Sequence, residues 1–289
     1  MAYVRPQTLD EALGLMASGR WTQLAGGTDV FPARAGKPLP DDVLDLGALG
    51  ELERIEEPPE YWAIGAGVTW AAIQRAKLPP AFFALQAAAR EVGAVQVQNR
   101  ATLGGNLCNA SPAADGVPAL LVLDAEVELR SRSVARRLRL EEFILGNRRT
   151  ARRPDELLTR ILVPKASASG GTAFQKLGAR RYLVISIAMC AARLALDEGG
   201  RVSHAAVAVG ACSPVAQRLP ALERDLLGRP AHREALAALP DPARHFAELS
   251  PIGDVRAAAS YRRVAAAEIV RRALAEAAGR LDAPCSAAA

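Results

Sequence analysis

Apolar residues recur at helical spacing at the start, in the middle and at the end of the chain. Between residues 9 and 16 they lie three and four positions apart, which predicts a short helix, and Thr8 can cap its first turn. Similar spacing predicts helices over residues 70–75 and 82–92. The last part of the chain has a helical pattern throughout and ends in a long predicted helix over residues 261–281.

Shorter apolar or alternating runs predict β-strands in two groups. The first group comprises residues 21–25, 43–46, 62–68, 127–130, 137–140 and 157–163. The second group comprises residues 172–177, 185–196 and 202–211, with a hairpin turn at 197–200. Residues 166–171, Ala-Ser-Ala-Ser-Gly-Gly, lie between the groups and predict a linker or loop. The stretch from 96 to 118 is rich in turn-forming residues and predicts irregular structure.

The composition suits a protein of two or three modest domains. The chain has 289 residues, half of them hydrophobic, so it can bury substantial cores. Its formal charge is +5, but the arginines are scattered and aromatic residues make up only 4%, which argues against nucleic-acid binding. No apolar run approaches the roughly 20 residues that span a bilayer, and the first residues lack a signal-peptide core. We therefore expect a cytoplasmic protein without membrane insertion.

The cysteines and histidines do not predict a metal site. None of the four cysteines has Cys-x-x-Cys spacing, so neither zinc nor an iron–sulfur cluster is indicated. The three histidines are far apart and lack ligand-like neighbours. We expect Cys108 to be a small packing residue rather than a redox group.

The first candidate binding segment is Leu24-Ala25-Gly26-Gly27-Thr28-Asp29, which follows a predicted strand. Glycines tolerate positive φ and let the backbone approach a ligand closely. Successive N–H groups in such a turn can bind an anion, and the Thr28 hydroxyl can donate to a phosphate. Taken alone, a Gly-Gly-Thr turn is more typical of an ordinary tight turn than of a nucleotide site.

The second candidate segment runs from Gln98 to Asp115 and concentrates small and polar residues. Thr102-Leu103-Gly104-Gly105-Asn106 can offer donors to a pyrophosphate, and Asp115 can accept from a sugar-like hydroxyl or cap the helix expected after it. The segment lacks the Gly-Lys-Ser/Thr of a P-loop and the Gly-x-Gly-x-x-Gly of a Rossmann fold. A nucleotide-like ligand is therefore indicated, but not by the two commonest devices.

These residues resemble the two FAD-binding signatures of the molybdenum hydroxylase flavoproteins. That family comprises the FAD-binding (medium) subunits of xanthine dehydrogenase and carbon monoxide dehydrogenase type. The matching segments are Ala25–Asp29, Thr102–Asn106, Ser111-Pro112 with Asp115, Ile144–Arg148, Pro154–Leu157, Phe174–Leu177 and Tyr261-Arg262. The resemblance covers almost the whole chain, and the second segment is its most discriminating part.

The resemblance implies an α+β fold in two domains. An FAD-binding domain of the vanillyl-alcohol-oxidase-like (PCMH) type would occupy residues 1–167, with its N-terminal part at about 1–55 and its middle part at about 56–167. A C-terminal domain like that of the CO dehydrogenase flavoproteins would occupy residues 168–289. This second domain combines a three-stranded antiparallel sheet with helices.

The resemblance also implies which residues contact FAD. They are Leu24, Ala25, Gly26, Gly27, Thr28, Asp29 and Val30, then Thr102, Leu103, Gly104, Gly105 and Asn106, and finally Ser111, Asp115, Leu158 and Lys176. Val92 is a further candidate beside the ligand. Tyr182 is a candidate to approach the flavin ring, and a packing role suits it equally. No residue of this chain is expected to act as a catalytic acid, base or nucleophile.

The function implied by the resemblance is electron transfer within a larger complex. A large subunit would carry the molybdenum cofactor, and a small subunit would carry two [2Fe-2S] clusters. The present chain would receive electrons from those clusters and pass them through FAD to an external acceptor. The complex is expected to be a heterotrimer or a dimer of heterotrimers.

Two other functions are compatible with the same residues. The chain could be a stand-alone FAD-dependent oxidase of the same fold group, although it lacks an extra substrate-sized domain. It could also be a nucleotide-binding interaction module without redox activity, although both glycine segments are retained. Bound flavin and co-purification with two further subunits distinguish these possibilities.

Overall fold

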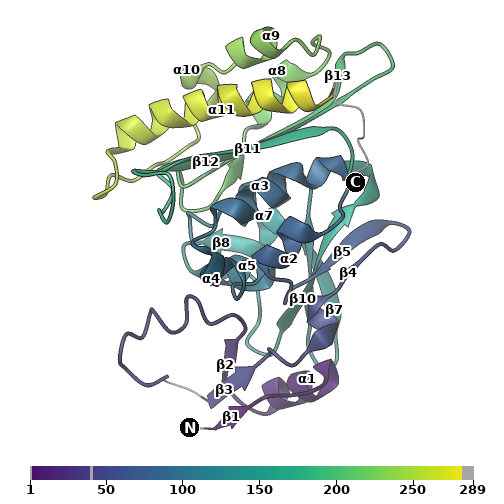
Figure 1. Ribbon diagram of the computed structural model, residues 1–289, viewed down its shortest axis with the longest axis vertical. Helices are drawn as coiled ribbons and strands as arrows, with labels where there is room; N and C mark the ends of the chain where they lie inside the picture. The colour runs from purple at the N-terminus through teal and green to yellow at the C-terminus, as the bar shows by residue number, and fades with distance from the viewer. Residues whose placement is uncertain (1, 40–41, 282–289) are drawn as a thin grey trace.

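The computed structural model describes residues 2–39 and 42–281, and its elements form three regions stacked along the long axis (Figure 1). A small sheet near the N-terminus lies at one end, a five-stranded sheet with helices occupies the middle, and a second large sheet with the longest helix lies at the other end. Within the described residues, no helix is both long enough and apolar enough to cross a membrane.

The N-terminal region combines one helix with a parallel sheet. Its elements are β1 (Tyr3–Val4), α1 (Leu9–Ser18), β2 (Trp21–Leu24) and β3 (Asp42–Asp45), with strand order β1-β3-β2. The Thr8 hydroxyl accepts a hydrogen bond from the Glu11 amide, which confirms the predicted cap of α1. Leu9, Leu13 and Met16 of α1 are buried against this sheet and its connections.

The middle region is an antiparallel sheet covered on one face by helices (Figure 1). Its strands, in spatial order, are β4 (Ile55–Glu56), β5 (Tyr61–Gly65), β10 (Leu157–Pro164), β6 (Glu126–Arg130) and β7 (Ala135–Arg139). The helices include α2 (Trp70–Arg75), α3 (Phe83–Glu91) and the short α7 (Leu140–Phe143), which leads into the hairpin β8 (Ile144–Gly146) and β9 (Arg149–Thr150). Because β10 pairs with β5, residues near 66 lie beside residues near 158.

The stretch from 96 to 118, predicted to be rich in turns, is largely covered by three short helices, of which only the last was expected. They are α4 (Val95–Gln98), α5 (Leu103–Asn109) and α6 (Gly116–Leu121). Helix α5 begins where the Thr102 hydroxyl accepts from the Gly105 amide at 3.0 Å, a regular N-cap. Glycine lowers intrinsic helix propensity, but burial of Leu103 and Leu107 stabilises this helix through packing.

The C-terminal region confirms three long antiparallel strands and adds a short fourth. Its sheet has the order β11 (Gly171–Leu177), β12 (Ala188–Leu196), β13 (Val202–Gly210) and β14 (Gln217–Arg218). Four helices belong to it, namely α8 (Pro220–Leu226), α9 (Arg233–Ala238), α10 (Pro242–His245) and α11 (Ala259–Leu281). Strand β12 starts at Ala188 rather than at the predicted 185, since residues 178–187 form a loop.

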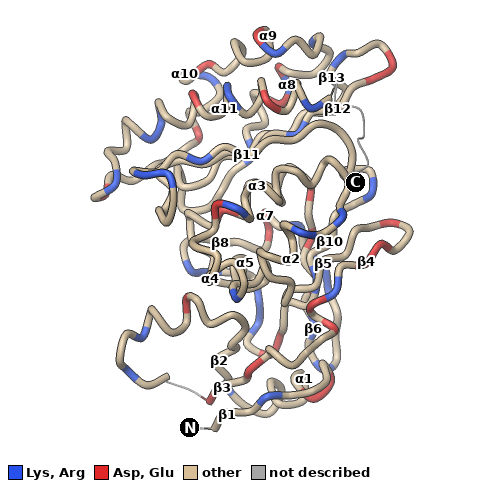
Figure 2. The backbone as a smooth tube through the Cα atoms, in the orientation of Figure 1, with Lys and Arg blue, Asp and Glu red and all other residues tan. Residues whose placement is uncertain are grey.

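The C-terminal sheet packs directly on the middle region. Its strand β11 lies against α3 (Figure 1), and β12 and β13 lie against α6. The buried guanidinium of Arg193 donates to the Val122 carbonyl at 2.6 Å and to Asp124 at 2.7 Å, which fixes the end of α6 to the sheet. Basic and acidic residues are interspersed along the described backbone (Figure 2).

Candidate functional site

A cavity of about 880 Å³ lies where the three regions meet. Its walls come from the segment after β2, the turn after β5, residues 100–115, the start of β10 and residues 183–185. Ligand pockets for small molecules and cofactors are commonly about 300–1,000 Å³. The cavity is therefore large enough for a dinucleotide-sized ligand.

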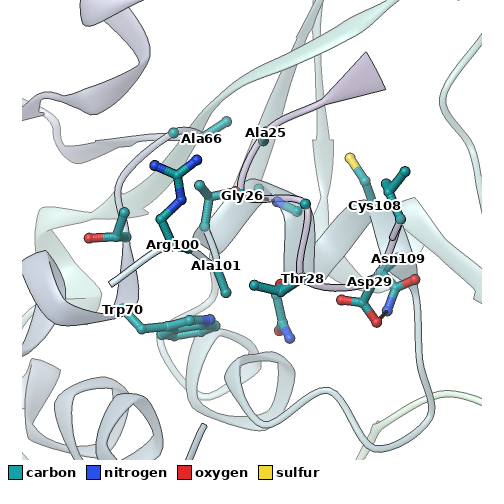
Figure 3. Close-up of a pocket in the computed structure, with 18 of the residues that line it drawn as sticks. Ala25, Gly26, Thr28, Asp29, Ala66, Trp70, Arg100, Ala101, Cys108 and Asn109 are labelled. Carbon is teal, nitrogen blue, oxygen red and sulfur yellow. Dashed lines mark hydrogen bonds between the residues drawn. The ribbon is translucent and has the colours of Figure 1, made fainter. Parts of the chain in front are cut away.

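The first glycine segment turns sharply at the cavity wall (Figure 3). Gly27 has φ +74, a left-handed conformation that favours glycine, and a Cβ on Gly26 would overlap the carbonyl oxygen of Arg100. Within the described part of the chain, no protein group accepts a hydrogen bond from the amides of residues 26–30. Residues 26–30 line the cavity, and successive amides without a protein acceptor suit an anion.

The second glycine segment has its amides already bonded within the protein. The Leu103 amide donates to the Val68 carbonyl and the Gly104 amide to the Ala66 carbonyl, both at 2.9 Å. The Gly105 and Asn106 amides both donate to Thr102. These four amides therefore donate within the protein, and donors to a ligand from this segment would have to come from other groups. Its glycines instead allow close packing, because a Cβ on Gly104 would lie 2.6 Å from the Ala66 Cβ.

Side chains of the second segment still face the cavity. Asn106 lines it, and the Asn106 Oδ1 atom is buried without a hydrogen-bond partner among the described residues. The side-chain amide of Asn109 donates from Nδ2 to Asp29 Oδ1 at 2.8 Å, a contact that joins the two segments (Figure 3). A buried amide oxygen without a partner is costly, so a donor from a ligand would complete this wall.

Asp115 occupies the N-cap position of α6, but its side chain does not cap the helix. One carboxylate oxygen accepts from Lys176 Nζ at 2.7 Å, and the other accepts from the Ser186 hydroxyl at 2.9 Å. Burial raises the pKa of Asp115, while Lys176 and Ser186 act in the opposite direction. Lys176 Nζ also donates to the Glu91 carbonyl at 3.1 Å.

Most of the residues predicted for cofactor contact line the cavity. They are Ala25, Gly26, Gly27, Thr28, Asp29, Val30, Thr102, Gly104, Gly105, Asn106, Ser111, Asp115 and Leu158. Leu24 and Leu103 are buried in cores beside it, and Lys176 lies behind Asp115. Val92 and Cys108 also line the cavity, and burial raises the pKa of the Cys108 thiol. Tyr182 is 63% exposed and does not line it.

Other cavity residues were not predicted from the sequence. Trp21, Gln23, Leu49, Leu52, Ala66, Trp70, Arg100, Arg148, Arg152, Leu183, Val184 and Ile185 belong to this group. Strand pairing and helix packing bring most of them to the cavity, and no local motif marks them. Of the segment 183–185, only Ile185 belonged to a predicted strand, and that prediction gave no sign of a cavity. Long-range contacts bring this segment to the cavity, because Lys176 before it and Ser186 after it both bind Asp115.

The arrangement fits FAD by its chemistry. Free amides of residues 26–30 suit a pyrophosphate, Asp115 suits a hydroxyl of the flavin's sugar-like chain, and Leu49, Leu52 and Leu158 offer apolar walls. No cluster of three or more His, Cys, Asp or Glu side chains suited to a metal occurs within residues 2–39 and 42–281.

Comparisons with known proteins identify both parts of the chain. Residues 1–166 match the family described as the FAD binding domain in molybdopterin dehydrogenase, and residues 173–277 match the CO dehydrogenase flavoprotein C-terminal domain. The chain is 33% identical over 244 residues to the nicotinate dehydrogenase FAD-subunit of Eubacterium barkeri, with 82% of each protein covered. It is 30% identical to the nicotine 6-hydroxylase medium subunit of Paenarthrobacter nicotinovorans, covering 96% of this chain and 97% of that protein.

A solved structure confirms the expected fold. Carbon monoxide dehydrogenase from Hydrogenophaga pseudoflava contains a chain that superposes with a TM-score of 0.87 at 29% identity, covering 97% of this chain and 98% of that one. The family match extends over more than half of the protein, and the relatives match almost end to end. The chain therefore belongs to the molybdenum hydroxylase family as an FAD-binding (medium) subunit, the flavoprotein component of an oxidoreductase.

Proposed function

We propose that the cavity binds FAD with its pyrophosphate on the amides of residues 26–30. The observation that carries this assignment is that residues 26–30 line the cavity and that their amides lack a protein acceptor among the described residues. Asp115 accepts from a hydroxyl of the flavin's sugar-like chain, through lone pairs that Lys176 and Ser186 leave open. Asn106 contributes its unpartnered oxygen.

The remaining assigned residues support the cofactor in three ways. Gly26, Gly104 and Gly105 allow backbone segments to approach one another and the ligand. Thr28 and Ser111 offer hydroxyls, and Asp29 holds Asn109 in place. The others, namely Leu24, Ala25, Val30, Thr102, Leu103 and Leu158, shape the wall or its support, while Lys176 acts through Asp115.

Electron transfer follows from the family and the site. When bound, FAD supplies a redox centre that exchanges electrons singly or in pairs. The protein binds this group, orients it and limits water around it, and no side chain of this chain acts as an acid or base on an organic substrate. The chain relays electrons from [2Fe-2S] clusters of a small partner subunit to an external acceptor, while a large subunit holds the molybdenum cofactor.

The assembly that suits this role is a heterotrimer or a dimer of heterotrimers in the cytoplasm. Relatives of this chain are named as medium chains or subunits of carbon monoxide dehydrogenase and nicotine 6-hydroxylase, which supports partners of this kind. We divide the chain into an FAD-binding domain at residues 1–167 and a C-terminal domain at residues 168–289. The two matched families, at 1–166 and 173–277, support that division.

Purification of the native complex tests this function. The proposal expects two further subunits and a flavin absorbance spectrum that follows the present chain when the subunits are separated. FAD released by denaturation should be stoichiometric with the chain. A chain that purifies without partners but oxidises a substrate with bound FAD would support the stand-alone oxidase instead. A chain that takes up no FAD would contradict the proposal.

A further inference from the structure

The loop between β11 and β12, residues 178–187, forms one edge of the cavity. We call it the cover segment. Its residues Leu183, Val184 and Ile185 line the cavity beside Asp115. At its end the Ile187 amide donates to the Leu177 carbonyl at 2.7 Å, and the Ile187 carbonyl accepts from the buried Arg262 at 2.6 Å. The cover segment is thus a closed loop with a fixed base.

The tip of the cover segment, around Tyr182 and Leu183, is not buried against the rest of the protein. Leu183 has φ +54, a left-handed conformation that is unusual for a residue other than glycine. Arg180 Nε donates to the carbonyls of Tyr182 and Leu183 at 3.0 and 3.1 Å, which holds this conformation. Tyr182, Leu183 and Ile185 each remain more than half exposed. Contacts within the tip therefore shape it, but they do not attach it to the cavity wall.

The attachment comes from Ser186. This side chain is 1% exposed, and its hydroxyl donates to Asp115 Oδ1. Lys176, which lies in β11 just before the cover segment, donates to Asp115 Oδ2. One residue before the loop and one near its end therefore hold the same carboxylate, one oxygen each. A carboxylate accepts about four hydrogen bonds, so each oxygen retains capacity toward the cavity.

We propose that Ser186 is a positioning residue for the cofactor. It fixes the rotation of the Asp115 carboxylate and holds the cover segment over the cavity through one hydrogen bond. This inference rests on the proposed function, because it assumes that Asp115 contacts FAD. With Lys176 alone, only one oxygen of the carboxylate is bonded within the protein and the group can rotate. Lys176 and Ser186 together bond both oxygens and fix its orientation.

Ser186→Ala tests the proposal, with Ser203→Ala, an exposed serine on β13, as the matched control. Loss of one buried hydrogen bond to a carboxylate should weaken FAD binding on the order of tenfold. It should also increase iodide quenching of the bound flavin's fluorescence. Trypsin should cleave faster after Arg180 and Arg181 in the FAD-free protein, since the tip is less restrained. Ser203→Ala should match the wild type in all three measurements.

Two further variants separate positioning from simple loss of structure. Ser186→Thr keeps the hydroxyl and should restore most of the FAD affinity. In an Asp115→Asn background, Ser186→Ala should weaken FAD binding by less than twofold, because Ser186 acts through that carboxylate. Wild-type FAD affinity in Ser186→Ala, or an undiminished loss in the Asp115→Asn background, would overturn the inference. Failure of the wild-type chain to bind FAD would instead refute the proposed function, while the trypsin measurement still tests the attachment.

Discussion

The two Gly-Gly pairs of this protein both line the cavity, but they differ in how the amides around them are hydrogen-bonded. At 26–27 the backbone turns through a positive φ, and the amides that follow have no protein acceptor among the described residues. At 104–105 the backbone is helical, and its amides bond to Ala66 and Thr102. The first pair offers donors to a ligand, and the second lets helix α5 pack closely. A glycine pair therefore does not by itself identify a donor site.

The largest expected effect comes from crowding the second pair. In Gly104→Val the side chain meets Ala66, including its backbone oxygen at 2.7 Å from the Cβ position, so the turn after β5 must shift. Overpacking typically costs about 1–3 kcal/mol and occasionally more, and we expect this variant at the upper end because backbone atoms must move. Urea unfolding should show this loss, accompanied by loss of FAD binding. Gly105→Ala meets only the Thr102 hydroxyl at 2.9 Å and should stay within about 1 kcal/mol of the wild type. Equal losses in the two variants would contradict the packing role of Gly104.

The first pair should respond mainly in FAD affinity. Gly27→Ala places a side chain at φ +74, which costs about 1–2 kcal/mol of stability. The strain should also turn the neighbouring amides away from the pyrophosphate and weaken FAD binding tenfold or more. Gly36→Ala is the matched control, because Gly36 has φ +81 but lies outside the cavity lining. It should keep normal FAD affinity, as measured by fluorescence titration, and lose less stability than Gly27→Ala, because a Cβ on Gly27 would also lie 2.6 Å from the Phe31 ring whereas a Cβ on Gly36 meets nothing. If Gly36→Ala weakened FAD binding as much as Gly27→Ala, the role of the first pair would be refuted.

The cap of helix α5 should have an intermediate effect. Thr102→Ala removes the acceptor of the Gly105 amide, and loss of such a cap costs about 1 kcal/mol. Thr102→Ser keeps the oxygen and should restore most of that stability. Thermal unfolding of the two variants measures the difference. A serine variant no more stable than the alanine variant would show that the hydroxyl does not cap the helix.

The smallest expected effect is a dependence of stability on pH. It should not change the cavity. Burial and the nearby Arg193 lower the pKa of His204, whose ring accepts from that guanidinium at 2.6 Å. The unfolded chain then binds more protons, so stability is present above about pH 6.5 and falls as pH drops toward the lower folded pKa. His204→Gln should flatten this decrease in urea unfolding between pH 7.5 and 5.5. A steeper decrease in the variant would contradict the lowered pKa.

Local sequence signals predicted most elements of this fold. Thr8 caps α1 as expected, and Thr69 caps α2 in the same way; both hydroxyls accept amide hydrogen bonds at 3.2 Å. Helical spacing also predicted α11. The signals failed where tertiary contacts override composition. Helix α5 looked like a loop because its glycines are weak helix formers, whereas packing on Ala66 stabilises it.

The candidate site was predicted in part. Motifs placed Gly26, Gly27 and Asp115 at the cavity, where they lie. The contact of Ser186 with Asp115 spans 71 positions, and no local pattern announces it. Ile185 was predicted to begin a strand, but residues 178–187 form a loop and the strand begins at Ala188. Long-range hydrogen bonds of this kind depend on how β11 and β12 pack against α6.

Hydrogen–deuterium exchange with and without FAD tests the contrast between the two glycine pairs most directly. In the FAD-free protein, amides of residues 26–30 should exchange quickly, since they lack protein acceptors among the described residues, while those of residues 103–106 should be protected. FAD should slow exchange at 26–30 by at least tenfold and change 103–106 little. Strong new protection at 103–106 with none at 26–30 would contradict the assignment of the first pair as the donor to the pyrophosphate.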